Sequence, residues 1–241
     1  MGLASAVEVE GVWKFFGERA ALRGVSFRVG EGEVFGLIGP NGAGKTTCFR
    51  ILATVLKPSR GFARIFGFDV REDAQEVRRV ISYLPEEAGV YRSLSGAEYI
   101  RFLARVYSRD EEESLREAEE ISGLGDALRA RMSSYSLGMR RRILLAGTLI
   151  ARPRLAILDE PTSGLDVMHA VYVRDVIRKY SRQGMTFLVS SHNMLEVEYL
   201  CDRIAFIDGG VIIAEGEPRS LMESAGAENL EELFLSLRGA R

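Results

Sequence analysis

The sequence contains few of the residues that cross-link a chain or bind metals. Two cysteines, Cys48 and Cys201, and two histidines, His169 and His192, occur among 241 residues. Neither cysteine belongs to a CxxC pair, and the histidines form no HExxH pattern. We therefore expect no disulfide framework, no structural zinc site and a reducing compartment.

Long apolar runs are absent as well. No stretch reaches the ~18 consecutive apolar residues of a membrane helix, and Met1–Glu10 lacks the basic-then-apolar pattern of a signal peptide. These absences predict a protein that stays in the cytoplasm and that needs another subunit to hold it at a membrane.

Charge of one sign is not in excess either. The 32 basic and 34 acidic residues give a formal net charge of −2. This balance argues against a dedicated nucleic-acid binder, because such proteins usually show a basic excess. One run of three arginines, Arg140–Arg142, is typical of a solvated helix face.

The chain alternates strand patterns with helical patterns. Short alternating or apolar runs predict strands at 7–10, 24–29, 33–38, 62–66, 155–158 and 186–190, and a hairpin at 203–207 and 211–214. Helical patterns cover 45–55, 170–182 and 229–237, and 88–151 is mainly helical, with an exposed acidic helix at 110–120. Together with 46% hydrophobic residues, this order predicts an α/β fold with helices packed on a sheet.

A glycine-rich segment between the strand at 33–38 and the helix that begins at Lys45 fits the GxxxxGK[ST] pattern. Its four fixed positions should arise by chance on the order of one per cent of the time in a chain of this length. In such a loop the backbone N–H groups face phosphate oxygens, Lys45 reaches the β- and γ-phosphates, Thr46 offers a hydroxyl to Mg²⁺, and Thr47 can donate to the α-phosphate. The predicted nucleotide-binding segment comprises Gly39, Pro40, Asn41, Gly42, Ala43, Gly44, Lys45, Thr46 and Thr47.

Two carboxylates follow the apolar strand at 155–158. Ligands of parallel sheets bind at the carboxyl ends of the strands, where the phosphate loop also leaves its own strand. We therefore expect Asp159 to hold Mg²⁺ through water, and Glu160 to orient or deprotonate an attacking water. The plain alternative is an acidic loop after a core strand.

The order of the motifs resembles the nucleotide-binding domain of ABC transporters over about residues 7–218. A phosphate loop alone is shared by many ATPases and GTPases, whereas the later motifs in this order are specific to that family. They are YSLGM at 135–139 in the place of the signature motif, LDEPTSGLD at 158–166, and Ser191-His192.

The resemblance implies that the signature segment contacts the γ-phosphate of ATP. The family motif reads LSGGQ, and this sequence keeps Ser136 and Gly138 but departs at Tyr135, Leu137 and Met139. Ser136 and the N–H of Gly138 would present donors at the positive end of a helix. Ser136 could at the same time be a plain helix cap.

Further positions match the family's ATP site. His192 resembles the switch histidine that contacts the γ-phosphate, and Ser163–Asp166 resembles the loop that crosses the dimer interface. Phe16 matches the aromatic residue that stacks on adenine, with Trp13 as the competing candidate. Glu86 stands where the family has a glutamine that contacts Mg²⁺ and the attacking water. Its charge would either raise the pKa of a neighbouring carboxylate or strengthen metal binding.

The resemblance also implies a particular α/β fold: a P-loop NTPase core with a parallel sheet, an N-terminal antiparallel β subdomain and an inserted helical subdomain. We expect the ATP-binding core to comprise 1–87 and 153–220. The helical subdomain with the signature motif would be 88–152, and 221–241 would form a C-terminal helical tail.

The function implied is that of an ATPase that powers an ABC transporter. A homodimer, or a dimer with a related subunit, would close on two ATP molecules, and hydrolysis would reopen it. A separate transmembrane permease subunit would hold the chain on the cytoplasmic face of the membrane, gripping it at Ala88–Leu94. Residues 85–87, 135–140 and 231–237 resemble subunits that serve exporters of drugs, antibiotics or polysaccharides. Two alternatives stay open: a soluble ABC-type ATPase acting on ribosomes or DNA, and a nucleotide-gated binding module without turnover.

Overall fold

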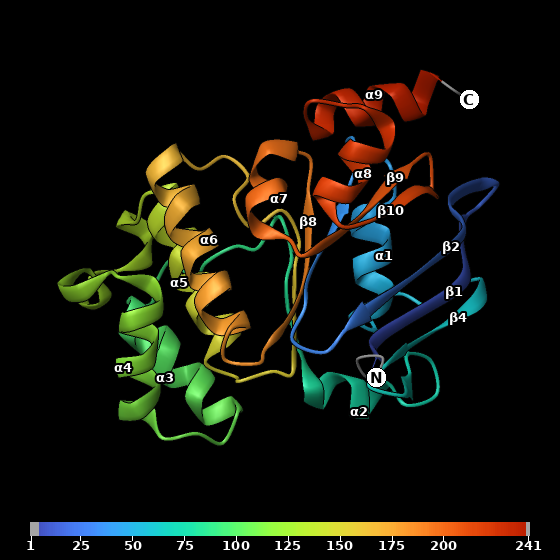
Figure 1. Ribbon diagram of the computed structural model, residues 1–241. Helices are drawn as coiled ribbons and strands as arrows, with labels where there is room; N and C mark the ends of the chain where they lie inside the picture. Colours follow the sequence, from blue (N-terminus) through green and yellow to red (C-terminus); the bar gives the residue numbers. More distant parts are fainter. Residues whose placement is uncertain (1–4, 240–241) are drawn as a thin grey trace.

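The computed structural model describes residues 5–239, which form two sheets with helices around the larger one (Figure 1). The smaller sheet is antiparallel, in the order β2-β1-β4-β5. Its strands are β1 (Ser5–Phe16), β2 (Arg19–Gly30), β4 (Arg60–Ile65) and β5 (Phe68–Asp69). The strands expected at 7–10 and 24–29 are parts of two longer strands that form one hairpin.

The larger sheet has six strands in the order β10-β9-β3-β8-β7-β6. Neighbouring strands pair in parallel, except that β10 pairs antiparallel with β9 as the expected hairpin. Its strands are β3 (Val34–Ile38), β6 (Ile81–Leu84), β7 (Leu155–Leu158), β8 (Thr186–Ser191), β9 (Arg203–Asp208) and β10 (Val211–Gly216). Every residue of β3 and β7 is buried, as the apolar runs predict for strands that are covered on both faces.

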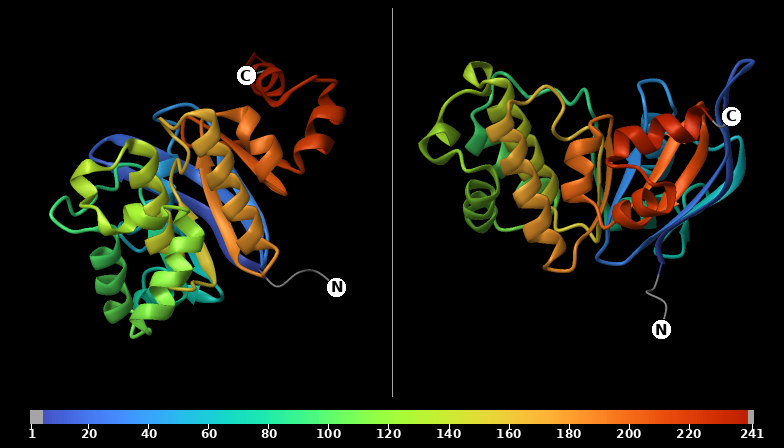
Figure 2. Two further views of the ribbon diagram at one scale, coloured as in Figure 1. Left: turned by 90° about the vertical axis from the view of Figure 1, so that its left-hand side faces the viewer. Right: turned by 45° about the horizontal axis from the view of Figure 1, so that its top comes forward.

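Alternate residues of the central strands contribute to two separate hydrophobic cores. Phe35 and Ile157 belong to the core that includes the small sheet and α1 (Lys45–Leu52). Ile38 and Leu158 belong to the core under α6 (Val167–Ser181) and α7 (Met194–Leu200), which also reaches the C-terminal helices. Those helices, α8 (Pro218–Ala225) and α9 (Leu230–Gly239), lie together at one end of the molecule (Figure 2).

Three helices lie together beside the large sheet (Figure 1). They are α3 (Gly96–Val106), α4 (Glu111–Ser122) and α5 (Leu137–Leu149), with the short 3-10 helices η1 (Gly125–Arg129) and η2 (Met132–Ser134) between α4 and α5. The acidic helix expected at 110–120 is α4, but it is not wholly exposed. Its Ala118 and Ile121 are buried in the core, so only its charged face meets solvent.

Some elements differ from the sequence patterns. The patterns do not predict α2 (Ala74–Val80), β6, α7 or α8, and α2 and α7 have only seven residues each, too few to establish a helical period. The helix expected at 45–55 ends at Leu52, and Thr54 has a φ of 60°, which is incompatible with a continuing right-handed helix.

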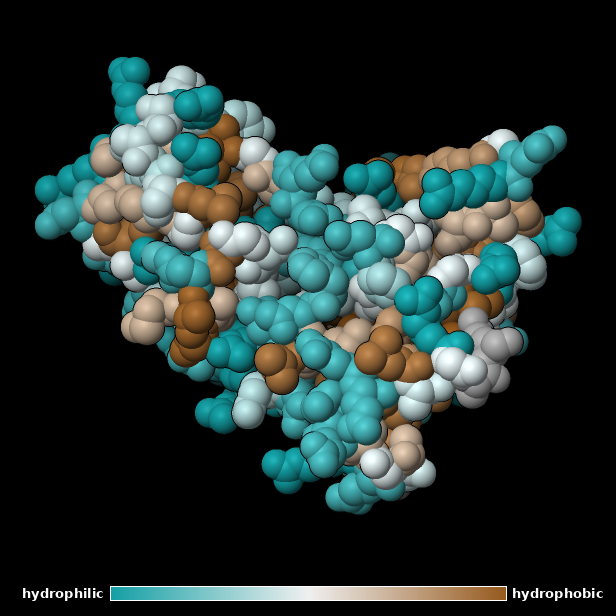
Figure 3. Space-filling model, turned by 90° about the horizontal axis from the view of Figure 1, so that it is seen from above, coloured by the Kyte–Doolittle hydropathy of each residue, from teal (hydrophilic) through white to brown (hydrophobic). Residues whose placement is uncertain are grey.

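The surface carries its apolar side chains in separate groups. Seen from above, it is mostly hydrophilic with scattered hydrophobic patches (Figure 3). Within 5–239, none of the helices combines the length and the apolar character that a membrane crossing requires. Cys48 and Cys201 are free and buried, and burial raises the pKa of Cys48 to about 12, so its thiol stays protonated at neutral pH.

Candidate functional site

The phosphate-loop segment joins β3 to α1 and borders a surface cavity of about 430 Å³. Besides the loop, three residues of the first hairpin and two acidic side chains line this cavity. The full lining is Phe16, Arg19, Ala21, Pro40, Asn41, Gly42, Ala43, Gly44, Lys45, Thr46, Thr47, Glu86 and Glu160. The structure therefore brings together the expected aromatic residue, the phosphate loop and two of the three expected acidic residues.

Gly39 opens the loop but does not line the cavity. A Cβ at this position would lie 2.0 Å from the carbonyl oxygen of Ile207, so only glycine fits against β9. The carbonyl oxygen of Gly39 instead accepts a hydrogen bond from Lys45. Gly39 thus shapes the site through its backbone.

The ammonium group of Lys45 is buried at the centre of the loop. Its Nζ donates to the carbonyl oxygens of Gly39 at 2.6 Å and Pro40 at 3.4 Å, and it lies 3.1 Å from Oε1 of Glu160. Lys45 is therefore surrounded by oxygen atoms on the side where a phosphate would enter. Phosphate oxygens are stronger acceptors than carbonyl oxygens, so a nucleotide could draw the ammonium group away from these partners.

The acidic pair lies at the carboxyl end of β7, where one hydroxyl group holds both residues. Oγ of Ser190 donates to Oδ1 of Asp159 at 2.6 Å and accepts from the backbone N–H of Glu160 at 2.9 Å. Ser190 lies on the neighbouring strand β8 and is fully buried. It belongs to no motif of the sequence. Its only signal there is its place at the end of an apolar run that precedes His192.

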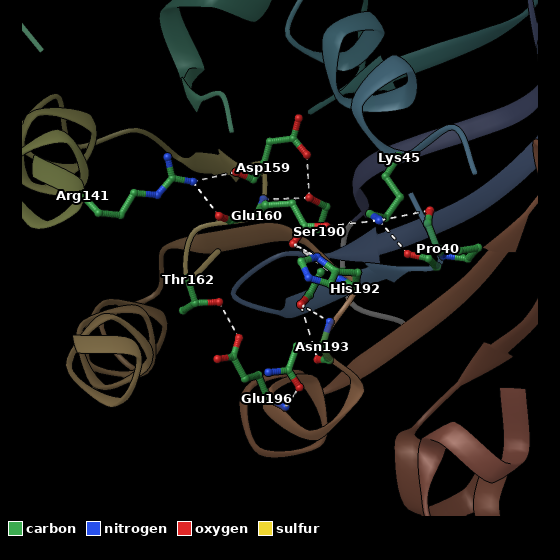
Figure 4. Close-up of polar contacts among 12 residues, drawn as sticks. Pro40, Lys45, Arg141, Asp159, Glu160, Thr162, Ser190, His192, Asn193 and Glu196 are labelled. Carbon is green, nitrogen blue, oxygen red and sulfur yellow. Dashed lines mark hydrogen bonds and ion pairs between the residues drawn. The ribbon is translucent and has the colours of Figure 1, made fainter. Parts of the chain in front are cut away.

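The carboxylate of Glu160 lies between Lys45 and His192 (Figure 4). Oε2 of Glu160 is 2.8 Å from Nδ1 of His192 and also accepts from the backbone N–H of His192 at 3.4 Å. The φ of Glu160 is 49°, a left-handed conformation that costs a non-glycine residue about 1–3 kcal/mol. His192 does not line the cavity and is joined to it through Glu160.

The oxygen atoms of the site fit a magnesium ion. Asp159 is completely buried, and its Oδ2 has no hydrogen-bond partner among the described residues. A buried carboxylate oxygen without a partner is unfavourable, and Mg²⁺ prefers such oxygen ligands. Thr46 and Glu86 line the phosphate-loop cavity, whereas Asp159, next to the lining residue Glu160, does not. Among the described residues, no group of three or more His, Cys, Asp or Glu side chains is arranged to hold a metal ion.

Of the two aromatic candidates, Phe16 borders the cavity and Trp13 does not. Phe16 lines the cavity with 49% of its surface exposed, and Nζ of Lys14 lies 5.3 Å from the centre of its ring. Trp13 stacks on Phe15 at a ring distance of 5.7 Å and does not line the cavity. Arg19 pairs with Phe16 across the hairpin, so both side chains leave the sheet on the same face. Arg19 is a lining residue that the sequence patterns did not reveal.

The signature segment lies at the start of α5 and not in the cavity. Oγ of Ser136 accepts a hydrogen bond from the backbone N–H of Met139 at 3.2 Å, so Ser136 is the N-cap of the helix. Gly138 lies against His169, since a Cβ on Gly138 would be only 2.6 Å from Cδ2 of that ring. Within one chain, neither Ser136 nor Gly138 lines the phosphate-loop cavity.

One member of the arginine run does not lie on a solvated helix face. Arg141 is 6% exposed, and its guanidinium donates to the backbone carbonyl oxygens of the acidic pair. Arg142 lies over the ring of Tyr172, 5.2 Å from its centre. The expectation is therefore wrong for Arg141. A run of charges carries no information about which member points toward the sheet, because that depends on how α5 packs.

Comparisons with known proteins agree with this geometry. A family model described as ABC transporter matches residues 22–163. The chain is 40% identical over 228 residues to the daunorubicin/doxorubicin resistance ATP-binding protein DrrA of Streptomyces peucetius, covering 93% of this chain and 69% of that protein. It is 37% identical over 220 residues to the ABC transporter ATP-binding protein NatA of Bacillus subtilis (strain 168), covering 90% of this chain and 89% of that protein.

A solved structure described as the ATP-binding subunit of an ABC transporter shares the fold. Its TM-score is 0.87 at 27% sequence identity, and the match covers 97% of this chain and 99% of that one. The region 22–163 matched by the family model contains the phosphate loop, the signature segment and the acidic pair. The chain therefore belongs to the ABC transporter family, as one of its ATP-binding subunits that hydrolyse ATP.

Proposed function

We propose that this chain powers an exporter from the cytoplasmic face of a membrane, bound to a separate transmembrane permease subunit, and that Glu160 activates the water that attacks ATP. The observation that carries the proposal is the position of the buried Glu160 carboxylate. It lies between Lys45 and His192, at the wall of the phosphate-loop cavity. Export is supported by the relative DrrA, which is described as a drug-resistance protein, because removing a drug from the cell protects the cell.

The cavity provides separate places for the parts of ATP. Phe16 would stack on adenine, and the N–H groups of the loop would bind the phosphates at the N-terminus of α1, whose helix dipole favours negative charge. Lys45 would move from Oε1 of Glu160 to the β- and γ-phosphates. That movement would free Oε1, since the ion pair with Lys45 at 3.1 Å is its one polar contact among the described residues.

Hydrolysis then needs a base beside the γ-phosphate. The oxygen of a water attacks the γ-phosphorus, and the bond from that phosphorus to the oxygen that bridges the β- and γ-phosphates breaks, so that ADP leaves. A proton of the water passes to Glu160. His192 holds Oε2 of Glu160 in place, so Oε1 is the oxygen that faces the water. Ser190 fixes the backbone from which the carboxylate projects.

Mg²⁺ would neutralise charge on the phosphates when bound. We propose that Asp159 holds it through the unpartnered Oδ2, that Thr46 contributes its hydroxyl, and that Glu86 contributes a carboxylate oxygen. Glu86 would make the site more negative than a glutamine would, which favours retention of a divalent cation.

Two copies of the chain, or this chain and a related subunit, would complete the site. Ser136 and Gly138 do not line their own chain's cavity, so we propose that they contact the γ-phosphate held by the partner. Apolar side chains near the start of α5 and α6 are free to enter such an interface. Leu137, Val167 and Met168 are 57%, 77% and 79% exposed.

The loop Ala88–Leu94 is the proposed docking place for the permease. Tyr91 is 57% exposed, and its ring lies 6.0 Å from that of Tyr99 and 6.3 Å from that of Phe102. The rings of Tyr91 and Tyr99 border a small cavity of about 240 Å³ that also reaches Leu84 at the end of β6. An apolar helix of a permease seated there would sense the movement of the segment that carries Glu86.

We further propose that the chain moves as the parts expected from its sequence. The core of 1–87 and 153–220 would turn relative to the helical subdomain of 88–152, and 221–241 would form the tail. Residues 1–4 and 240–241 lie outside the described residues. This division would let the signature segment approach a partner while the phosphate loop stays on its sheet.

Membrane recovery and nucleotide hydrolysis test the proposal together. The chain should copurify with a membrane protein from its native cells, and the purified chain should hydrolyse ATP with Mg²⁺ but not with chelator present. Lys45→Ala should lose nucleotide binding, whereas Trp13→Ala should retain it. Recovery of active chain only from the soluble fraction would favour an ATPase unconnected with transport, and binding without hydrolysis would favour a nucleotide-gated module.

A further inference from the structure

Arg141 makes an unusual set of contacts for an arginine of a helix. It lies in the second turn of α5, and its side chain is almost fully buried. Nη2 donates to the carbonyl oxygens of Asp159 and Glu160, each at 2.7 Å (Figure 4). Nε donates to the carbonyl oxygen of Pro161 at 2.9 Å, and Nη1 donates to those of Pro85 and Glu86 at 3.1 and 3.3 Å. The side chain thus has five backbone acceptors.

These contacts use the whole hydrogen-bonding capacity of the side chain. A guanidinium group has five N–H donors: one on Nε and two on each terminal nitrogen. Each nitrogen of Arg141 has as many carbonyl acceptors as it has N–H donors: one at Nε, two at Nη1 and two at Nη2. A lysine could not replace it, because an ammonium group has three donors and no planar fork.

The two segments that Arg141 joins carry the reacting groups. Residues 85–86 follow β6 and residues 159–161 follow β7, and these strands are neighbours, with Leu84 paired to Leu158. The carbonyl group of Glu160 belongs to a residue in the left-handed conformation, which persists only where its surroundings hold it. Ser190 holds the N–H side of that residue and Arg141 holds the carbonyl side.

We propose that Arg141 is a positioning residue that fixes the backbones of Glu86 and Glu160 to α5. Both carboxylates then keep their place over ATP only while α5 keeps its position against the sheet. The inference rests on the proposed roles of Glu160 and Glu86. It assigns to Arg141 a mechanical link between the helix that begins at Ser136 and the groups that handle the attacking water. A shift of about 1 Å in a catalytic group can cost about a hundredfold in rate.

The test compares Arg141→Lys and Arg141→Gln with Arg142→Lys as the matched control. Arg142 is the next residue of the same helix, but it lies over Tyr172 and makes no hydrogen bond to the two segments. Both Arg141 variants should lower kcat about tenfold to a hundredfold, while the Kd for ATP, measured by fluorescence titration without hydrolysis, stays within about threefold of the parent because the phosphate loop is untouched. Arg142→Lys should hydrolyse ATP like the parent.

A second measurement separates positioning from general stability. Because Arg141 acts through Glu160, Arg141→Lys should lower the residual turnover of Glu160→Gln by much less than it lowers that of the parent, a non-additive result. Equal fold-losses in both backgrounds overturn the inference, and so does normal kcat in both Arg141 variants. Loss of folded structure in both variants would make Arg141 a stability residue and also overturn it. Normal turnover of Glu160→Gln would instead refute the proposed base, whatever the Arg141 variants do.

Discussion

The variant Gly138→Ala, which adds a single methyl group, tests how closely α5 packs against His169. The Cβ of an alanine there would lie 2.6 Å from Cδ2, 2.7 Å from Cγ and 2.9 Å from Nε2 of His169. The ring cannot easily move away, because its Nδ1 lies 2.8 and 2.7 Å from the two carboxylate oxygens of Asp166. Overpacking of this kind typically costs about 1–3 kcal/mol. In a domain of this size each kcal/mol lowers Tm by about 2–4 °C, so Gly138→Ala should melt roughly 2–12 °C lower.

The assay is thermal unfolding of four proteins: the parent, Gly138→Ala, His169→Ala and the double variant. His169→Ala removes the ring that the new methyl group meets, while Asp166 still caps α6 at the backbone N–H of residue 169. In that background Gly138→Ala should therefore lower Tm by less than half as much. An unchanged Tm for Gly138→Ala, or the same loss with and without His169, would refute the packing argument.

This contact also changes how the shared ATP site should be probed. A carboxylate introduced at Gly138 would meet His169 of its own chain before it met any phosphate, so its effect would mix steric strain with charge repulsion. Ser136 is a cleaner position. It is exposed, and its side chain serves as the helix cap, a role that aspartate can also fill.

Three further predictions follow from the site. Lys45→Ala and Ser136→Asp should each fail to trap ATP as homodimers, but mixed dimers should trap more than either variant alone, because both defects fall in one of the two shared sites. Mixed dimers that form and trap no more would exclude a cross-chain site, and Ser136→Asn is the uncharged control. Phe16→Ala should weaken ATP binding about 2- to 10-fold by loss of stacking, whereas Trp13→Ala should leave the titration unchanged; the reverse pattern would move the adenine platform to Trp13. Tyr91→Cys should crosslink to a copurified membrane protein, and crosslinks confined to this chain would argue against docking at that loop.

Much of the fold could be predicted because its key strands are short, wholly apolar and followed by informative residues. The run that forms β3 leads directly into the phosphate loop, and the run that forms β7 ends in Asp159 and Glu160. The order of these motifs also fixed the family. Elements without such marks were missed, because β6 has four residues and α7 has seven, and neither carries a periodic pattern of its own.

The sequence motifs predicted the residues that line the candidate site, but not the residues that hold them in place. Lys45, Glu86, Glu160 and Phe16 share one cavity, as their motifs suggest. The role of Ser190 could not be read from sequence, because it depends on β8 lying next to β7 in the folded sheet. Arg141 was misread for a similar reason: its environment is set by tertiary packing, which local charge patterns do not describe.

The central claim is that Glu160 is the base for ATP hydrolysis, and the most direct test is single-turnover hydrolysis by Glu160→Gln. The amide keeps the size of the side chain and can still accept a hydrogen bond from His192, but it cannot take a proton from water. The account predicts that this variant binds Mg-ATP like the parent and hydrolyses it about 10²–10⁴ times more slowly. Hydrolysis at the parental rate, with binding intact, would contradict it.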